Sequence, residues 1–355
     1  MKLLLSGYYG FGNAGDEAVL AAILTHLSDR FNQPRFTVAS GDPAATSQMH
    51  SCASQKYLLD TIKRDDFKTL AANIKKADLF ISGGGSLLQD VTSLRNVAYH
   101  CGLLRLAQFK RTPSMMYAQG VGPLNHPLSQ KLVRMATAKT SAITVRDNAS
   151  KVLLQSIGIK SPIQVTADPV WGLEADGEKS STFQKESVWC VSLRSWPGDE
   201  ENTSRKRVAA TLAALRDLAM RRGAVLRFLP MQAKVDDALL ASLGVLPGEW
   251  ITTAGIHPAK IMAQTANCDL MIAMRLHALI FAASQKVPCV AINYDPKVAA
   301  LAEILRIPLL EGTECSQSDK LGAAIEQAKS PQLDTLENLK QAARRNAEIA
   351  GHCKK

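Results

Sequence analysis

The sequence predicts an α/β protein of two domains, each built on a parallel β-sheet. The chain has 355 residues, about twice the usual length of a domain. Short apolar runs alternate with amphipathic stretches, the pattern of a parallel sheet covered on both faces. The polar stretch Leu173–Glu186 interrupts this pattern and is expected to link the domains. We therefore predict an N-terminal domain at residues 1–172, a C-terminal domain at 187–330, and a final helix, 331–355, that packs back on the first domain.

The predicted elements follow in chain order. In the first domain, apolar runs predict strands at Lys2–Ser6, Arg35–Ala39, Asp78–Ser82, Ser114–Ala118, Ala142–Arg146 and Ile163–Val165. Helical spacing predicts helices at Glu17–Asp29 and Lys151–Ser156. In the second domain, strands are expected at Val188–Leu193, Val225–Leu229, Asp269–Ala273 and Cys289–Asn293. A long helix near Arg205–Arg222 is expected to end at Gly223, because glycine readily adopts the conformation that terminates helices.

Composition excludes several classes of protein. Hydrophobic residues make up 46% of the chain and charged residues 21%, which is typical of a globular protein and not of a disordered one. The longest apolar run, Ala18–Leu24, is far shorter than a membrane span, and no signal-peptide core precedes the first glycines. Seven scattered cysteines without a C-x-x-C pair predict neither a disulfide framework nor a zinc site. We therefore expect a cytoplasmic location.

The net charge of +10 predicts an anionic partner. Nucleic acid is not expected, because aromatic residues make up only 5% of the chain and no block concentrates the charge. An anionic membrane surface is a candidate for weak, reversible contact at the inner membrane face. The expected contacts are Lys131, Arg134, Lys340, Arg344, Arg345, Lys354 and Lys355.

The first predicted strand is followed by a glycine-rich turn. Gly10, Gly12 and Gly15 fit G-x-G-x-x-G between a strand and a helix, where glycines permit a tight turn and helix N–H groups can bind an anion. However, Asp16 and Glu17 stand where a pyrophosphate would lie, and would repel it. Asp16 either caps the helix or points at a sugar hydroxyl, and both interpretations remain open.

Two further glycine clusters, Gly83, Gly84 and Gly85, and Gln119 with Gly120, close the predicted strands Asp78–Ser82 and Ser114–Ala118. In parallel α/β sheets, ligands bind at the carboxyl ends of the strands, where small residues let the backbone approach a ligand. We therefore expect these loops to line a binding site together with Gly10 and Asn13.

Several charged side chains also follow predicted strands. Arg146 ends one strand of the first domain and suits a phosphate or carboxylate, while Asp147 with Ser150 predicts a helix start. Arg194 ends a strand of the second domain.

The densest signal lies in the second domain. Arg275 and His277 interrupt an apolar stretch, and Tyr294 and Lys297 follow the next strand. A histidine near an arginine and a lysine suits proton transfer beside an anionic substrate.

Seven motifs, taken in order, resemble those of the bacterial polysaccharide pyruvyl transferases, closest to the CsaB type of cell-wall polymer synthesis. They are Gly7–Glu17, Ser82–Asp90, Gln119–Pro123, Val145–Asp147, Ala167–Val170, Met274–His277 and Tyr294–Lys297. The resemblance implies a GT-B-like fold, in which two Rossmann-like domains with parallel sheets face each other across a cleft. The N-terminal domain would be the acceptor side and the C-terminal domain the donor side.

The same resemblance implies phosphoenolpyruvate as the donor and a hexosamine, often N-acetylmannosamine, of a lipid-linked saccharide as the acceptor. The product would be a 4,6-linked pyruvate ketal, with phosphate released and no metal or cofactor required. The implied functional residues are Asp16, Arg146, Arg275, His277 and Lys297, with Leu276 in the donor-binding set.

Chemistry supports these roles. Phosphoenolpyruvate carries roughly three negative charges, which Arg146, Arg275 and Lys297 could hold. His277 could deliver a proton to the methylene carbon, and Asp16 could orient or deprotonate the acceptor hydroxyl.

Two other functions stay open. A GT-B glycosyltransferase would bind a nucleotide sugar in its second domain. A non-catalytic dinucleotide- or glycan-binding protein would use the first glycine motif with Asp42 on the ribose, and would leave Arg275 and His277 without a task.

Overall fold

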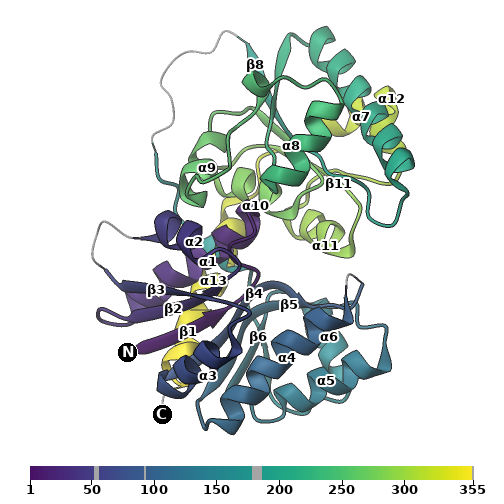
Figure 1. The fold of residues 1–355 in the computed structure, drawn as a ribbon. Helices are drawn as coiled ribbons and strands as arrows, with labels where there is room; N and C mark the ends of the chain where they lie inside the picture. The colour runs from purple at the N-terminus through teal and green to yellow at the C-terminus, as the bar shows by residue number, and fades with distance from the viewer. Residues whose placement is uncertain (52–55, 92, 178–185, 354–355) are drawn as a thin grey trace. The chain divides into compact units, whose positions relative to one another are not determined.

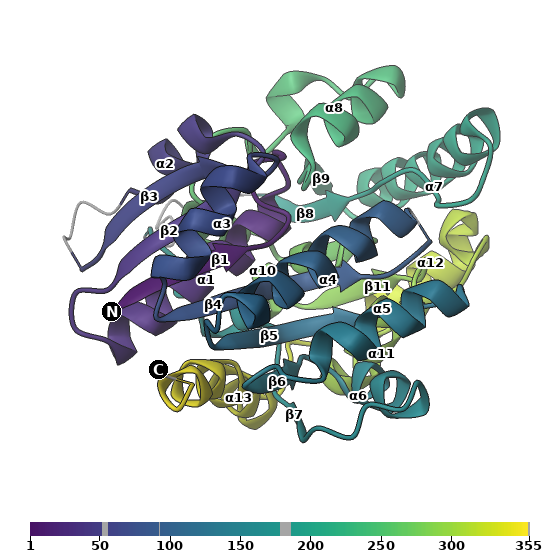
Figure 2. The same ribbon diagram turned by 60° about the horizontal axis from the view of Figure 1, so that its bottom comes forward.

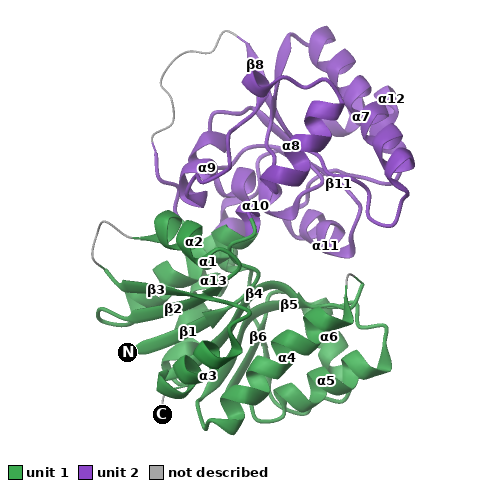
Figure 3. Ribbon diagram, viewed as in Figure 1, with its two compact units in different colours: residues 1–11, 16–173, 338–355 green, residues 12–15, 174–337 purple. Residues whose placement is uncertain are grey.

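The computed structural model describes residues 1–51, 56–91, 93–177 and 186–353, which form two compact units (Figures 1 and 3). Unit 1 comprises residues 1–11, 16–173 and 338–355, and unit 2 comprises residues 12–15 and 174–337. The chain therefore passes from unit 1 to unit 2 after Leu173, where the polar stretch begins. Residues 178–185 of that stretch lie outside the described residues.

Unit 1 contains a parallel sheet of seven strands in the order β3-β2-β1-β4-β5-β6-β7. The strands are β1 (Lys2–Ser6), β2 (Arg35–Ser40), β3 (Leu58–Lys63), β4 (Leu79–Leu88), β5 (Ser114–Val121), β6 (Ala142–Val145) and β7 (Ile163–Val165). All six strands predicted for this part of the chain are confirmed. The sequence did not predict β3, because this edge strand is only partly buried and lacks a continuous apolar run.

The second and third glycine clusters lie inside strands, and the prediction that they form loops was wrong. β4 continues through Gly83, Gly84 and Gly85, and β5 continues through Gln119 and Gly120. Parallel pairing persists here, with Gly85 opposite Gln119. Glycine is needed in β4 because a Cβ at Gly84 would lie only 2.2 Å from the Val19 side chain.

Helices cover the sheet of unit 1 on both faces (Figure 2). α3 (Phe67–Lys76), α4 (Leu94–Phe109), α5 (Pro127–Thr137) and α6 (Asn148–Ser156) share one hydrophobic core with β4, β5 and β6. α13 (Leu333–Gly351) covers the opposite face, where Asn346 Oδ1 lies 2.6 Å from the hydroxyl of Thr144. Side chains alternate along a strand, and Ile143 and Val145 on either side of Thr144 point into the core beneath α4 and α5. The remaining helices are α1 (Ala14–Arg30), α2 (Pro43–His50) and the short 3-10 helix η1 (Pro169–Gly172).

Unit 2 contains a parallel sheet of five strands in the order β12-β11-β10-β8-β9. The strands are β8 (Ser187–Ser192), β9 (Ala224–Phe228), β10 (Leu270–Ala273), β11 (Cys289–Ile292) and β12 (Leu309–Leu310). The helices are α7 (Glu201–Arg221), α8 (Ala233–Ser242), α9 (Pro258–Thr265), α10 (Leu276–Ser284), α11 (Pro296–Leu305) and α12 (Ser318–Gln327), with 3-10 turns at Pro247–Glu249 and Glu314–Ser316. The four predicted strands and the long helix are confirmed. This helix ends before Gly223, which has a φ of +64°.

In the described part of the chain, no helix is both long and apolar enough to cross a membrane.

Candidate functional site

The first glycine turn is divided between the two units: Gly10 belongs to unit 1, whereas Gly12–Gly15 belong to unit 2, where the N–H of Ala14 donates to the carbonyl of Met231 at 2.7 Å. The N–H of Gly10 donates a hydrogen bond of 2.7 Å to Oε1 of Glu17, whose other oxygen lies 2.8 Å from Nε2 of His50. Both side chains of this Glu17–His50 pair are buried. A buried carboxylate therefore accepts the hydrogen bond from the Gly10 N–H that a dinucleotide pyrophosphate would need. Asp42, which would contact the ribose of a dinucleotide, instead caps α2 by accepting from the N–H of Ala45 at 3.0 Å. Sequence analysis missed His50, because nothing local links it to Glu17, 33 residues earlier.

Asp16 is not the N-cap residue of the helix that follows this turn, but it lies in the first helical turn, where a carboxylate complements the helix dipole as one of the two interpretations expected. α1 begins at Ala14, and Oδ1 of Asn13 accepts the N–H of Gly15 at 2.9 Å, as a cap does. Asp16 lies in the first helical turn, where its carboxylate is 3.2 Å from the position that a Cβ of Gly85 would take. Asp16 adds to the effect of burial in raising the pKa of Tyr9. The carboxylate thus faces the glycine segment of β4.

Gln119, predicted to line a loop, is fully buried within β5. Its Nε2 donates to Oγ of Ser82 at 2.9 Å and so ties β5 to β4. The Gln119 side chain therefore joins the two strands inside the sheet and does not line a loop.

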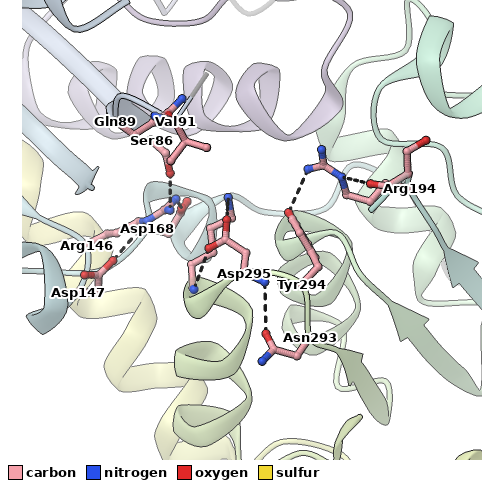
Figure 4. A network of polar contacts seen from close by, with 12 residues as sticks. Ser86, Gln89, Val91, Arg146, Asp147, Asp168, Arg194, Asn293, Tyr294 and Asp295 are labelled. Atoms are coloured by element: carbon pink, nitrogen blue, oxygen red, sulfur yellow. Dashed lines mark hydrogen bonds and ion pairs between the residues drawn. The ribbon is translucent and has the colours of Figure 1, made fainter. Parts of the chain in front are cut away.

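Arg146 lies directly after β6, and oxygen atoms of three side chains lie near its guanidinium group (Figure 4). Its Nη1 lies 3.0 Å from Asp168 Oδ2, and its Nη2 donates to Oγ of Ser86 at 2.9 Å. Asp147 lies 3.6 Å away and caps α6 through the N–H of Ser150, as predicted.

The glycine that follows Gln119 makes room for this guanidinium group. A Cβ at Gly120 would lie 2.7 Å from Nε of Arg146. Arg146 is nearly buried and is oriented by Asp168, whose role the sequence analysis did not assign.

In unit 2, Arg275 follows β10 and occupies the N-cap position of α10, without making a side-chain cap hydrogen bond. Its Nη2 pairs with Asp236 Oδ1 of α8. The second oxygen of Asp236 accepts the N–H groups of Met231 and Gln232, both at 3.0 Å. Among the described residues, no group accepts a hydrogen bond from the buried Nε of Arg275. Sequence analysis missed Asp236, because its partner lies 39 residues further along the chain.

His277 lies in the first turn of α10, and its ring packs against Gly15, which belongs to the same unit. A Cβ at Gly15 would lie 2.3 Å from Nδ1 of His277. The third glycine of the G-x-G-x-x-G motif therefore accommodates an imidazole ring. Leu276, between Arg275 and His277, packs its side chain into the core.

The ring of Tyr294, which follows the carboxyl end of β11, lies near two cationic side chains (Figure 4). The guanidinium of Arg194 lies 4.8 Å from the centroid of the Tyr294 ring, and its Nη1 donates to the tyrosine hydroxyl at 3.3 Å. The ammonium of Lys297 lies 5.8 Å from the same centroid and 3.2 Å from Asp295 Oδ2. Asp295 also caps α11 through the N–H of Lys297 at 3.1 Å.

Each of the three predicted anion-binding cations is thus paired with a carboxylate. The pairs are Arg146–Asp168, Arg275–Asp236 and Lys297–Asp295. Such partners fix the direction of long cationic side chains before a ligand arrives. Within the residues that the structure covers, no group of three or more His, Cys, Asp or Glu side chains could hold a metal ion.

The sequence was compared with families of known proteins. The sequence model of the polysaccharide pyruvyl transferases matches residues 13–296. The chain belongs to this family. A curated relative, the amylovoran biosynthesis protein AmsJ of Erwinia amylovora, is 21% identical, with 98% of this chain and 96% of that protein aligned. The protein is therefore a transferase that moves a pyruvyl group to a polysaccharide. Of the three functions that the sequence left open, the family supports the pyruvyl transferase.

Solved structures show the fold. The UDP-GlcNAc 2-epimerase of Methanocaldococcus jannaschii matches with a TM-score of 0.67 at 12% identity, over 99% of this chain and 100% of that chain. The corresponding epimerase of Neisseria meningitidis, bound to UDP-GlcNAc, matches with a TM-score of 0.64 at 12% identity over 99% and 100%. Anabaena HepE in complex with UDP-glucose matches with a TM-score of 0.59 at 13% identity over 100% and 96%. The pyruvyl transferase therefore has a GT-B-like fold of two Rossmann-like units, as predicted.

Proposed function

We propose that this pyruvyl transferase uses phosphoenolpyruvate as its donor and binds it in unit 2. The observation that carries this proposal is the start of α10. There the buried Nε of Arg275 has no acceptor among the described residues, and the helix N-terminus lacks a side-chain cap. Helix N-termini and arginine forks both favour anions. Lys297 follows β11, which is the neighbour of β10, and supplies a second cation.

Two cations suit a donor with two anionic groups, a phosphate and a carboxylate. We assign Arg275, the backbone of Leu276 and Lys297, all of unit 2, to donor binding. Arg146, which belongs to unit 1, stays a donor-binding residue predicted from the sequence. The guanidinium of Arg194 and the ammonium of Lys297 lie 4.8 and 5.8 Å from the centroid of the Tyr294 ring. We assign Arg194 and Tyr294 to the support of Lys297.

His277 serves in this proposal as the proton donor. Protonation of the methylene carbon creates an oxocarbenium-like centre at the neighbouring carbon, to which the first sugar hydroxyl adds with loss of its proton. The carbon–oxygen bond to phosphate then breaks, and the second hydroxyl adds and loses its proton. The products are a ketal and inorganic phosphate. General acid–base groups contribute about 100-fold or more to such steps.

Unit 1 is proposed as the acceptor side, and the acceptor as a hexosamine of a cell-wall or surface polysaccharide precursor, joined through its 4- and 6-hydroxyls. Asp16 would orient or deprotonate the acceptor hydroxyl. Its carboxylate lies beside Gly85 of β4, 3.2 Å from the position that a Cβ of that glycine would take. We further propose that the acceptor is lipid-linked, so that the enzyme acts at the inner membrane face.

One experiment tests this function. The protein is incubated with phosphoenolpyruvate and a panel of nitrophenyl or lipid-linked hexosamines, with His277→Gln as the inactive control. We expect release of phosphate and a product heavier by one pyruvate less one water. A calorimetric titration that shows no binding of phosphoenolpyruvate would overturn the proposed donor.

A further inference from the structure

One stretch of unit 1 carries most of the surplus positive charge of the chain. Residues 67–139 hold ten Lys or Arg against Asp78 and Asp90, so this stretch accounts for eight of the ten surplus charges, and the expectation that no block concentrates the charge was wrong. Both aspartates accept hydrogen bonds from backbone N–H groups. The helices α3, α4, α5 and α6, which cover this face, contain no Asp or Glu. The acids nearest to this face are Asp65, which is exposed in the turn before α3, and Asp66 and Asp147, which cap α3 and α6.

The cations on this face are accessible. Three lysines lie on α3, Arg95 and Arg105 on α4, and Lys131 and Arg134 on α5, and all seven side chains are exposed. The four helices lie side by side on the sheet (Figure 2). We call their outer surface the basic face.

Large apolar side chains are exposed among these cations. Phe67 at the start of α3 is 59% exposed and Phe109 at the end of α4 is 79% exposed. Leu128, Met135 and Val152, on α5 and α6, are also exposed. Isolated exposed apolar residues are ordinary, but five on helices that contain no Asp or Glu form a combined apolar and basic surface.

A groove of about 810 Å³ opens on the same face, between α4 and the turn from β3 to α3. Its walls are Phe67, Tyr99, Leu103 and Leu106, and Arg64 lies with its guanidinium 4.4 Å from the Tyr99 ring centroid. Gly102, which also lines the groove, has no atom within 4 Å of the position that a Cβ would take, so the groove stays open there.

We propose that the basic face is the surface by which this enzyme docks on an anionic lipid bilayer, an inference that rests on the lipid-linked acceptor of the proposed function. Arginine and lysine contact lipid headgroups, and aromatic and aliphatic side chains enter the interface between headgroups and acyl chains. A second copy of this face would bring like charges together. A nucleic acid would satisfy the cations, but it would leave Leu128, Met135 and Val152 in water.

This surface revises the contacts expected from the sequence. Lys131 and Arg134 lie on the basic face, but Lys340, Arg344 and Arg345 lie on α13, which covers the opposite side of the sheet. Lys354 and Lys355 lie outside the described residues. A flat bilayer cannot contact both sides of one sheet at once, so the α13 residues are not part of the docking surface.

The test compares two variants that lose the same charge. One carries Arg95→Gln, Arg105→Gln, Lys131→Gln and Arg134→Gln, and the control carries Lys234→Gln, Lys260→Gln, Lys320→Gln and Lys329→Gln, all exposed residues of unit 2. Cosedimentation is measured with phosphatidylglycerol–phosphatidylcholine vesicles and with phosphatidylcholine vesicles alone. Each cation near an anionic surface contributes about fivefold in affinity. We therefore expect the first variant to bind the anionic vesicles at least 100-fold more weakly, and the control variant to bind them almost as the unaltered protein does.

Phe109→Ser provides a second measurement, because its loss should weaken vesicle binding severalfold without changing the net charge. Binding should also disappear at roughly 0.5 M salt, where charges are screened. Equal losses in both charge variants, equal binding to neutral vesicles, or displacement of the vesicles by an oligonucleotide would overturn the proposal. Turnover of a water-soluble hexosamine should be the same in all variants. If the unaltered protein shows no such turnover but docks as expected, the proposed function fails and the docking surface stands.

Discussion

The imidazole of His277 fills the space that a side chain at Gly15 would need, because a Cβ there would lie 2.3 Å from Nδ1. Gly15 is the last glycine of a motif that usually indicates phosphate binding. Here it positions a titratable ring in the first turn of α10. The glycine motif thus has a structural purpose that does not involve a dinucleotide.

Gly15→Ala should lower turnover about 10- to 100-fold, because displacing a reacting group by roughly 1 Å costs up to that much. The melting temperature should also fall, because the added Cβ would lie 2.8 Å from Cγ and 3.1 Å from Cβ of His277, so turnover is compared at a temperature where the variant is folded. The matched control is Gly248→Ala in unit 2, since a Cβ at Gly248 would meet no atom within 4 Å. Normal turnover of Gly15→Ala would mean that the position of His277 is unimportant to the reaction.

His277→Gln should reduce kcat about 100-fold or more, the usual contribution of a general acid or base. The affinity for phosphoenolpyruvate should remain within a few-fold, because the donor is bound mainly by cations and by the N-terminus of α10. Steady-state kinetics and calorimetry separate the two effects. A variant that turns over normally would identify His277 as a packing residue only.

Arg146→Lys should raise the KM for phosphoenolpyruvate about tenfold, because a single ammonium replaces a fork that contacts Asp168 and Ser86. Arg134→Lys on the exposed face of α5 is the control and should leave KM unchanged. An unaltered KM in the Arg146 variant would remove this residue from donor binding.

Asp236→Asn should lower the free energy of unfolding by about 3 kcal/mol, the usual scale for breaking a buried ion pair. The carboxylate is buried and receives Arg275 and two backbone N–H groups. Donor affinity should fall with it, because Arg275 loses the partner that orients it. Denaturant unfolding and donor titration provide the two readouts, with Asp237→Asn as the control. If only stability changes, Asp236 serves the fold and not the donor.

His100→Leu should make the protein less sensitive to acid. Burial, with a smaller contribution from Arg64, lowers the pKa of His100 from 6.5 to about 3. Between these values the unfolded chain binds a proton that the native protein does not, so stability present above pH 6.5 is lost as the pH falls towards 3. At pH 5 this loss is about 2 kcal/mol.

The leucine variant should avoid that loss, and its free energy of unfolding should fall less between pH 7 and pH 5 than that of the unaltered protein. His352→Leu, at an exposed position, is the control. Parallel pH curves for the unaltered protein and His100→Leu would show that His100 does not govern acid sensitivity.

Strands such as β1 and β10 could be predicted, because a strand that is buried on both faces has apolar residues at consecutive positions. The edge strand β3 could not, since half of its residues face solvent. The glycine segments of β4 and β5 were taken for loops, because glycine is common in turns and only sheet pairing shows that Gly85 lies opposite Gln119.

The sequence by itself determined which residue types follow the strands, and so identified Arg146, Arg275, His277 and Lys297 as candidates. Only the tertiary structure decided their partners: Asp168 for Arg146, Asp236 for Arg275 and Gly15 for His277. It also placed seven exposed cations of α3, α4 and α5 on one face of unit 1, opposite α13. The physical reason is that helix and strand periodicity depends on near neighbours in the chain. A buried ion pair or a close backbone approach depends instead on the order of the strands in the sheet, which joins residues far apart in sequence.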